Sequence, residues 1–550
     1  MLALCVTTKT FSQALPDSLT KRIDSLFQKW NQPNSPGCSI GIIRNDTLIY
    51  AKGYGMANLE YAIPNTAETP FHMASISKQF TAWSIILLAR QGKLKLDDDI
   101  RKYLPWFPDL KTGINIRRLL NHTSGVRDQW QLLATAGTRL DDVITQDQII
   151  KILSKQQALN FMPGDKYMYS NSGFTLLAEI VKSVSGQTLR QFTDSAIFKP
   201  LGMNNTHFHD DYTEIVKNRS YSYDRTDSIH FTNSILSYSN AGATSLFTNI
   251  NDMSKWVMNF YTHKTGDQQV VDTLTKKGKL NNGRVLTYAS GIGVSTYKGW
   301  KQFSHGGADA GYRTFITVFP DLKMGFLVFS NLGDFNTGNK TYAMADLFLK
   351  DTATKKEAVK KEIKDSTLAL LKDTASAKKF VGYYVGEEGL PFSFDIHAGK
   401  LYYHIYAESS PLIQDSVNRF YIPQAPEISF LFAIKGKDTT VDITTGEDFH
   451  HLEKYKKDTA RSIVLLKKYT GVYYCPELDC NYRIILKGRS LVLTHAKYPD
   501  APLTLINEDH LTNDNWWMNH LKILRDSKNS ISGFEVNSGR VMHLKFNKVE

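Results

Sequence analysis

The segment "ASISKQF" (residues 74–80) decides how this 550-residue chain is interpreted. Ser75 and Lys78 are three residues apart, so they share one face if the segment is helical. A serine hydroxyl is a poor nucleophile until a base takes its proton, and a partly desolvated lysine can be neutral enough to do so. Apolar residues then recur at helical spacing as far as Gly92, which predicts a helix with the serine at its amino terminus. The field at that end of a helix also favours a developing oxyanion.

The S-x-x-K pattern alone is weak evidence, because it also begins at three other serines, Ser18, Ser295 and Ser376. A Tyr-Ser-Asn tripeptide supplies context, and it occurs twice. The first copy, in "YMYSNSGF" (167–174), follows a Pro-Gly turn and leads directly into a helical pattern. We therefore expect Tyr169 and Asn171 to lie at the entrance of a helix and to face a cleft.

The second copy, in "LSYSNAGA" (236–243), has no such anchor, because a run of small residues follows it. We expect it to form a structural turn near the same cleft. A third element, His305-Gly306-Gly307, stands directly before a segment with the pattern of a β-hairpin.

These three elements, in this order, resemble the three motifs of the serine β-lactamase and penicillin-binding protein superfamily. The likeness is greatest to its class C-like branch (peptidase family S12), which includes carboxypeptidases, D-aminopeptidases and esterases. The segments "LLNHTSGV" (119–126) and "GATSLFTNINDMSKW" (242–256) are also typical of that branch. The resemblance covers roughly residues 30–350.

The resemblance implies a five-stranded antiparallel sheet flanked by helices, with an all-helical subdomain and the site between them. It also implies an acyl-enzyme mechanism. Ser75 attacks the carbonyl, while Lys78 and Tyr169 move protons and Asn171 binds a substrate amide. The oxyanion hole is expected from the backbone N–H groups of Ser75 and Ala308. No metal and no cofactor is implied.

The third motif of the superfamily is usually Lys-Thr-Gly, and here this sequence departs from the pattern. Literal matches at Lys111 and Lys264 lie in a turn and after a helix, and His397-Ala398-Gly399 lies outside the catalytic region, so strand context favours His305. A mostly neutral histidine and a glycine would replace a permanent cation and a hydroxyl. This favours substrates without a carboxylate beside the scissile bond, such as amino-terminal D-residues, amides or esters.

An aminopeptidase also needs an acidic group for the free amine of its substrate. Asp309 and Asp128 are within sequence reach of the site. A β-lactamase or D-alanyl-D-alanine carboxypeptidase, and a simple esterase, remain alternatives within the enzyme class. A non-catalytic sensor that binds β-lactams or peptidoglycan fragments on the same scaffold is an alternative of another class.

The order of the predicted elements indicates an α/β (α+β) catalytic domain. Residues 38–60 read as two strands around an Asn-Asp turn, and helical patterns dominate from about 98 to 260. Strands return near 286, with a hairpin at 311–331. Strands at both ends with helices between them predict a sheet built from distant segments.

The carboxyl-terminal region contains an internal repeat, in which "KKFVGYYVGEEG" (378–389) returns as "KKYTGVYYCPEL" (467–478). Each copy opens a segment rich in β-branched and aromatic residues, which predicts two related small antiparallel barrels similar to the D-aminopeptidase architecture. These barrels could simply stabilise the catalytic domain, or a loop from one could enter the cleft and restrict it to small substrates. The expected divisions are a signal peptide (1–14), a hydrolase domain (15–350), a lysine-rich linker (351–377) and two barrel domains (378–460 and 461–550).

Composition is that of a soluble globular protein, with 42% hydrophobic and 22% charged residues. The net charge of +12 comes with no nucleic-acid-binding motif, so we expect no nucleic-acid partner. The short apolar run 1–6, followed by the small residues Ser12 and Ala14, predicts a signal peptide and a periplasmic or secreted protein. Because the run is short and lacks a basic leader, we expect either a truncated signal or an internal start at Met1. No further segment is apolar enough to span a membrane.

Only four cysteines are present, and their spacing fits no zinc template, so the sequence indicates no metal site. Cys5 could be a lipoprotein cysteine, although Leu4 before it is bulky for such a site. Cys475 and Cys480 could close a small disulfide loop or remain buried thiols.

Overall fold

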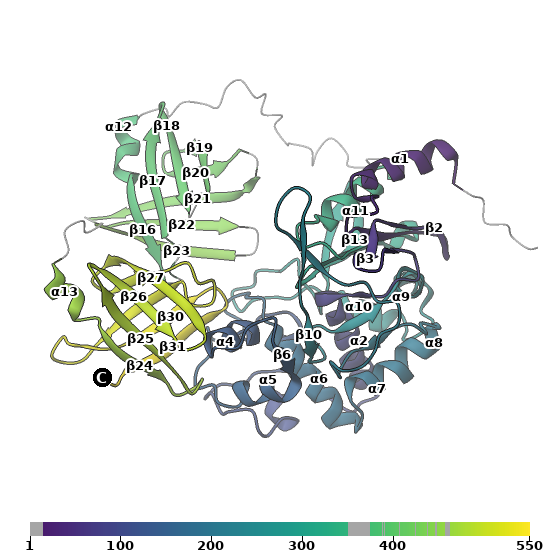
Figure 1. The fold of residues 1–550 in the computed structure, drawn as a ribbon, viewed down its shortest axis with the longest axis horizontal. Coiled ribbons are helices and arrows are strands. Elements are labelled where there is room, and N and C mark those ends of the chain that lie inside the picture. Colours follow the sequence, from purple (N-terminus) through teal and green to yellow (C-terminus); the bar gives the residue numbers. More distant parts are fainter. Residues whose placement is uncertain are drawn as a thin grey trace, which may run out of the picture.

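A computed structural model describes residues 15–349 and 374–550, the latter with short gaps at 388, 390, 406–407, 424, 437, 446–447 and 457–461 (Figure 1). The predicted signal peptide and Cys5 lie outside the described residues, as does most of the predicted linker. The end of that linker forms the one-turn helix α12 (Thr374–Ala377). Among the described residues, no helix is long and apolar enough to cross a membrane.

The catalytic part is organised around one antiparallel sheet in the order β12-β13-β14-β15-β1-β2. Its strands are β1 (Cys38–Arg44), β2 (Thr47–Tyr54), β12 (Gly293–Tyr297), β13 (Trp300–Asp309), β14 (Tyr312–Phe319) and β15 (Met324–Ser330). Asn45 and Asp46 make the expected tight turn, both with positive φ. Residues from the two ends of this domain meet in the pairing of β1 with β15.

The expected number of five strands is wrong, because β12 adds a sixth strand to the edge of β13. Their register runs from Gly293 opposite Ser304 to Tyr297 opposite Trp300. The hairpin between them turns at Lys298 and Gly299, both of which have positive φ. Strands were expected from near residue 286, but a five-residue edge strand with mixed polarity gives little periodic signal, so the sequence did not fix the number of strands.

Helices cover both faces of this sheet. On one face, α1 (Asp17–Phe27) and α11 (Thr337–Ala345) bury Phe27 and Met344 in one hydrophobic cluster. On the other face, α2 (Ser77–Arg90) and α9 (Ile250–Thr262) belong to a larger cluster that extends into the helical region. The further helices of this part are α3 (Ile116–Leu120), α4 (Gln129–Thr135), α5 (Gln146–Leu153), α6 (Asn171–Ser185), α7 (Leu189–Thr193), α8 (Lys199–Leu201) and α10 (Gln268–Leu274).

Short strands outside the main sheet join distant segments of the domain. β11 (Leu246–Thr248) lies between β5 (Phe71–His72) and β7 (His207–Phe208), while β10 (Ser237–Ser239) pairs in parallel with β6 (Val143–Thr145). Two small hairpins complete the set, β3 (Met56–Asn58) with β4 (Ile63–Pro64), and β8 (Tyr223–Arg225) with β9 (Phe231–Asn233).

The carboxyl-terminal region forms two closed antiparallel barrels of eight strands each, which confirms the expectation drawn from the repeat. The first barrel consists of β16 (Gly382–Gly386), β17 (Pro391–His397), β18 (Lys400–Ile405), β19 (Glu408–Ser416), β20 (Arg419–Ile422), β21 (Ala425–Lys435), β22 (Asp438–Thr445) and β23 (Asp448–Tyr455). After α13 (Ile463–Lys467), the second consists of β24 (Gly471–Cys475), β25 (Cys480–Lys487), β26 (Ser490–His495), β27 (Tyr498–Asn507), β28 (His510–Thr512), β29 (His520–Arg525), β30 (Ile531–Ser538) and β31 (Val541–Lys548). The second barrel, yellow in Figure 1, lies against α4 of the catalytic part.

The described cysteines are all buried thiols, which decides between the two possibilities left open for the second barrel. Cys475 and Cys480 face each other across the β24–β25 hairpin, and both are free. Burial raises the pKa of both thiols, so they remain protonated and act as small apolar side chains.

Candidate active site

Ser75 is held at a strained turn in front of α2. Ala74 has a φ of 48°, which is unusual for a residue with a side chain, and its N–H donates to His72 Nδ1 at 3.2 Å. Within residues 69–86, every residue is buried except Ser75, which is partly exposed. Strain held by surrounding structure is typical of functional positions, and here it presents one hydroxyl from an otherwise buried segment.

Lys78 is completely buried, and its amine has three partners from three segments of the chain. Nζ lies 3.0 Å from Ser75 Oγ, 2.8 Å from Asn171 Oδ1 and 2.7 Å from the carbonyl oxygen of Ala243. The amide and carbonyl oxygens can only accept hydrogen bonds, so they take two of the amine's hydrogens. A neutral amine then directs its lone pair at Ser75, which is the arrangement that a base for the serine requires.

Electrostatics make this neutral amine available. Burial lowers the pKa of Lys78 to about 7, the negative charges of Asp309 and Asp128 oppose that shift, and the positive charge of Arg540 adds to it. A substantial fraction of Lys78 is therefore neutral near neutral pH, and the fraction grows as the pH rises.

Tyr169 lies directly before α6, as predicted, and its hydroxyl hydrogen-bonds Ser75. Burial raises the pKa of Tyr169, while the hydrogen bond to Ser75 and the charge of Arg540 oppose that shift. The phenol is therefore protonated at neutral pH. Lys78 is the better base in the free site, and Tyr169 is placed to pass a proton between the serine and a leaving group.

Asn171 is buried and begins α6, where its side chain is held at both ends. Its Oδ1 accepts from Lys78, and its Nδ2 donates to Asp128 Oδ2 at 2.8 Å. The same carboxylate oxygen accepts from the Asn171 backbone N–H at 2.7 Å, and Asp128 Oδ1 caps α4. Asp128 thus holds Asn171, which in turn holds the amine of Lys78. One N–H of the Asn171 side-chain amide remains available to a substrate.

The third motif lies where the sequence predicted it, on β13 beside the nucleophile turn. A Cβ atom on Gly307 would lie 2.4 Å from the Met73 carbonyl oxygen and 3.1 Å from Ala74 Cβ, so only glycine allows this approach. His305 Nδ1 lies 2.6 Å from the Gly306 carbonyl oxygen, and Nε2 lies 2.9 Å from the Tyr288 hydroxyl.

His305 does not replace the cation of the usual motif. Burial, helped by the charge of Lys78, lowers the pKa of His305 to about 4, so the ring is neutral at physiological pH. Its Nδ1 donates to a backbone carbonyl, and its Nε2 can accept from Tyr288. The mostly neutral histidine expected from the sequence agrees with these contacts.

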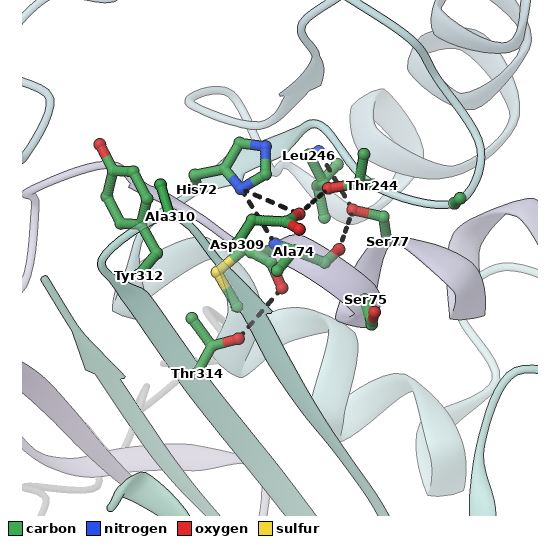
Figure 2. Close-up of polar contacts among 12 residues, drawn as sticks. His72, Ala74, Ser75, Ser77, Thr244, Leu246, Asp309, Ala310, Tyr312 and Thr314 are labelled. Carbon is green, nitrogen blue, oxygen red and sulfur yellow. Dashed lines mark hydrogen bonds and ion pairs between the residues drawn. The ribbon is translucent and has the colours of Figure 1, made fainter. Parts of the chain in front are cut away.

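Asp309 follows Ala308 on the same strand and reaches the edge of a cleft of about 790 Å³. Figure 2 shows its carboxylate between Thr244, whose hydroxyl donates to Oδ2, and the ring of His72, whose Nδ1 lies 3.8 Å away. Burial raises the pKa of Asp309. Burial also lowers the pKa of His72, so its imidazole is neutral. Ala308 and Asp309 both line the cleft.

The second Tyr-Ser-Asn copy belongs to the cleft wall, but it is a strand and not the expected turn. Tyr238 lies in β10, lines the cleft and stacks on Trp130 with ring centroids 4.7 Å apart. The parallel pairing of β10 with β6 holds this segment straight. A three-residue strand whose partner is almost a hundred residues away leaves no periodic signal in the sequence.

The second barrel contributes a residue that sequence reasoning missed. The β30–β31 turn places the Arg540 guanidinium 4.9 Å from the centre of the Tyr169 ring. Its backbone is clamped on both sides, because its N–H donates to Gln131 Oε1 at 2.8 Å and its carbonyl accepts from Asn160 Nδ2 at 2.9 Å. Trp516 of the same barrel also lines the cleft. The repeat pointed to a barrel here, but nothing in the sequence indicated which of its turns faces the site.

A buried ion pair fastens this barrel to the catalytic part. The Arg127 side chain, fully buried, lies 2.6 Å from Glu477, and it also donates to the carbonyls of Met542 and His543 at 2.9 and 2.7 Å. The Tyr482 hydroxyl donates to the carbonyl of Thr135. These contacts fix the β30–β31 turn relative to the nucleophile.

Comparisons with known proteins agree with this architecture. The family model for "Beta-lactamase" matches residues 23–349. Penicillin-binding protein 4* of Bacillus subtilis (strain 168) is 25% identical over 453 residues, which cover 78% of this chain and 94% of that protein. A D-aminopeptidase of Brucella anthropi is 28% identical over 280 residues, or 50% of this chain and 52% of that protein. The match thus spans about half the length of that D-aminopeptidase.

A solved structure shares the fold beyond the catalytic part. The octameric penicillin-binding protein homologue from Pyrococcus abyssi superposes with a TM-score of 0.54 at 23% identity, over 80% of this chain and 99% of that one. The fold and the arrangement around Ser75 define the class of β-lactamase-related serine hydrolases. The family model covers more than half of the sequence, and this chain belongs to the β-lactamase family.

Proposed function

We propose that this chain is an exported serine hydrolase that forms an acyl-enzyme at Ser75 and cleaves peptides, amides or esters of D-amino acids. The contact between Lys78 Nζ and Ser75 Oγ carries the proposal. Lys78 takes the serine proton as Oγ attacks the carbonyl, and the backbone N–H groups of Ser75 and Ala308 stabilise the oxyanion. Tyr169 passes the proton to the leaving group, and water then releases the acid.

The substrate class rests on the charges at the cleft. His305 is neutral, so the third motif offers no cation to a carboxylate beside the scissile bond. Asp309 lies next to Ala308 and can pair with a free amine on the acyl side of that bond. The D-aminopeptidase similarity supports the same substrate class.

The first test is release of p-nitroaniline from D-alanine p-nitroanilide. We expect turnover by the full chain, and a loss of about a thousandfold or more in Ser75→Ala, because no other group replaces the nucleophile. Ser295→Ala is the matched control, since Ser295 begins another S-x-x-K pattern, on β12, and should leave turnover unchanged. Equal turnover by wild type and Ser75→Ala would disprove the acyl-enzyme.

The amine subsite is tested by Asp309→Asn with D-alanine p-nitroanilide and its N-acetyl derivative. Loss of a charged pair should lower kcat/KM for the free amine by about 10- to 100-fold. The acetylated substrate should be little affected at about pH 8.5, where Lys78 is already neutral. Equal losses on both substrates would mean that Asp309 supports the site without binding the amine.

A D-alanyl-D-alanine carboxypeptidase or β-lactamase is the second candidate, and Arg540 is the observation that favours it. The described contacts give its guanidinium an aromatic face but no carboxylate partner. It could therefore bind a substrate carboxylate that His305 does not. Hydrolysis of a β-lactam or a D-Ala-D-Ala peptide in preference to D-alanine p-nitroanilide would favour this candidate.

Export is the remaining part of the proposal, and it rests on the apolar run 1–6 followed by Ser12 and Ala14. The enzyme would then meet cell-wall peptides outside the cytoplasm. Amino-terminal sequencing of the protein from a cell fraction outside the cytoplasmic membrane, compared with cytosol, tests this. A protein found intact in the cytosol would contradict it.

A further inference from the structure

A second cluster of reactive side chains lies on the far side of β11 from Asp309 and is not used by the hydrolytic site. His207 and His209 alternate on β7 and the residue after it, so both rings project from the same side of the strand. Glu214 returns to the same place from the following loop. Each of the three side chains offers one potential ligand atom, and these atoms all lie within 4.8 Å of one another.

The spacing of these atoms is too long for hydrogen bonds. Glu214 Oε2 lies 3.9 Å from His207 Nε2 and 3.6 Å from His209 Nδ1. Both nitrogens are buried, and neither has a hydrogen-bond partner among the described residues. His209 is only 3% exposed, so this nitrogen has lost water without gaining a protein partner. A single ligand between these two nitrogens and the carboxylate oxygen would account for both missing hydrogen bonds.

We propose that His207 Nε2, His209 Nδ1 and Glu214 bind a divalent transition-metal cation, with zinc as the favoured ion. Two ligands at about 2.0–2.2 Å in a tetrahedral site are about 3.4 Å apart, so small movements of the side chains would close the observed spacing. Imidazole and carboxylate suit zinc better than calcium or magnesium, which prefer oxygen ligands alone. His207 also lines a cleft of about 700 Å³, from which water can supply a fourth ligand.

The protonation states and the neighbouring charges fit this ion. Burial lowers the pKa of both histidines, that of His207 to about 4, so the rings are neutral and their nitrogens can coordinate. Arg190 holds Glu214 with two bonds of 2.6 and 2.7 Å and also bonds Asp210. Each carboxylate oxygen has a second lone pair, so Arg190 can orient Glu214 while Oε2 coordinates the ion.

The site would brace β11, which pairs with β5, the strand that leads to the nucleophile. The His209 N–H donates to the Ser245 carbonyl at 2.7 Å, and His207 pairs with Phe247 on β11. The Phe247 ring contacts both His209 and His72, with centroids 5.3 and 5.2 Å away. His72 accepts the Ala74 N–H, so a cation at this cluster lies behind the turn that presents the serine.

The test is whether the full chain, after treatment with a chelator, binds zinc. Binding is measured by calorimetric titration with zinc chloride and by thermal melting. We expect one equivalent to bind and Tm to rise. His207→Ala and His209→Ala should each weaken binding by at least about tenfold. The control is His230→Ala, which removes an exposed histidine of the same domain that is paired with Asp227.

Cobalt provides a readout that does not depend on the variants. Cobalt(II) chloride should give the strong visible absorption of a tetrahedral nitrogen and oxygen site, and zinc should displace it. His207 is half-buried, so His207→Ala remains informative if His209→Ala does not fold. Absence of binding at about 100 μM zinc, or equal affinity in wild type and His207→Ala, would overturn the proposal.

Discussion

The two barrels share one local design, yet they approach the active site differently. The second barrel places Arg540 over the Tyr169 ring, whereas the first barrel only lines the cavity beside Tyr169, through Phe449 and His450. The Tyr384 hydroxyl donates to the Phe380 carbonyl at 2.9 Å, and the Tyr473 hydroxyl donates to the Tyr469 carbonyl at 2.6 Å. Gly382 has a φ of 141°, and the equivalent Gly471 in the second repeat has a φ of 151°. The repeat seen in the sequence is therefore also a repeat of contacts, since equivalent residues make the same hydrogen bond in both barrels.

The difference lies in the loops and not in the barrels. The second barrel buries Glu477 against Arg127 and extends Arg540 over Tyr169. In the first barrel, the Asp442–His451 pair is typical of the ion pairs found there, since both side chains are partly exposed. The same framework is thus present twice, and a few loop residues determine which copy contacts the catalytic side chains.

The largest expected effect in this comparison comes from breaking the buried pair. Glu477→Ala leaves Arg127 charged and buried without its partner, which should cost about 3–5 kcal/mol. Asp442→Ala removes an exposed pair in the first barrel and should cost less than about 1 kcal/mol. Calorimetric melting of both variants measures the difference. Similar melting of the two variants would mean that the second barrel is not fastened through Arg127.

A smaller effect is expected from Arg540→Ala, which removes a positive charge that lowers the pKa of Lys78. That pKa should rise by a few tenths of a unit to about one unit. Because only neutral Lys78 acts as base, activity is lost as the pH falls through that pKa, so the acid limb of the kcat profile should move to higher pH. Arg419→Ala in the first barrel is the matched control and should leave the profile in place.

The smallest expected effect is a loss of stability of the same size in the two barrels. Tyr384→Phe and Tyr473→Phe each remove one hydroxyl that donates to a carbonyl within the same repeat. Each should cost about 1 kcal/mol of stability, because a buried acceptor loses its donor. Urea unfolding of both variants measures this. A loss of stability in one variant and none in the other would show that the two hydrogen bonds do not contribute equally to the two barrels.

Much of the fold followed from local patterns. The Asn45–Asp46 turn, the hairpin of β14 and β15 and the helix after Ser75 were all predicted, because periodicity and turn residues act over a few positions. The number of strands in the sheet and the strand at Tyr238 were predicted incorrectly. Both of these strands are short, and the strand at Tyr238 exists only because a segment almost a hundred residues away supplies its hydrogen-bonding partner.

For the site, the sequence by itself selected the residues to which we assign the chemistry. Ser75, Lys78 and Tyr169 stand in motifs whose spacing and order are specific, and helical geometry alone places the first two together. Only the tertiary structure decided the acceptors that hold Lys78, the acidic group beside Ala308 and the arginine over Tyr169. Those contacts join segments up to several hundred residues apart, and their geometry arises from packing, which no local pattern records.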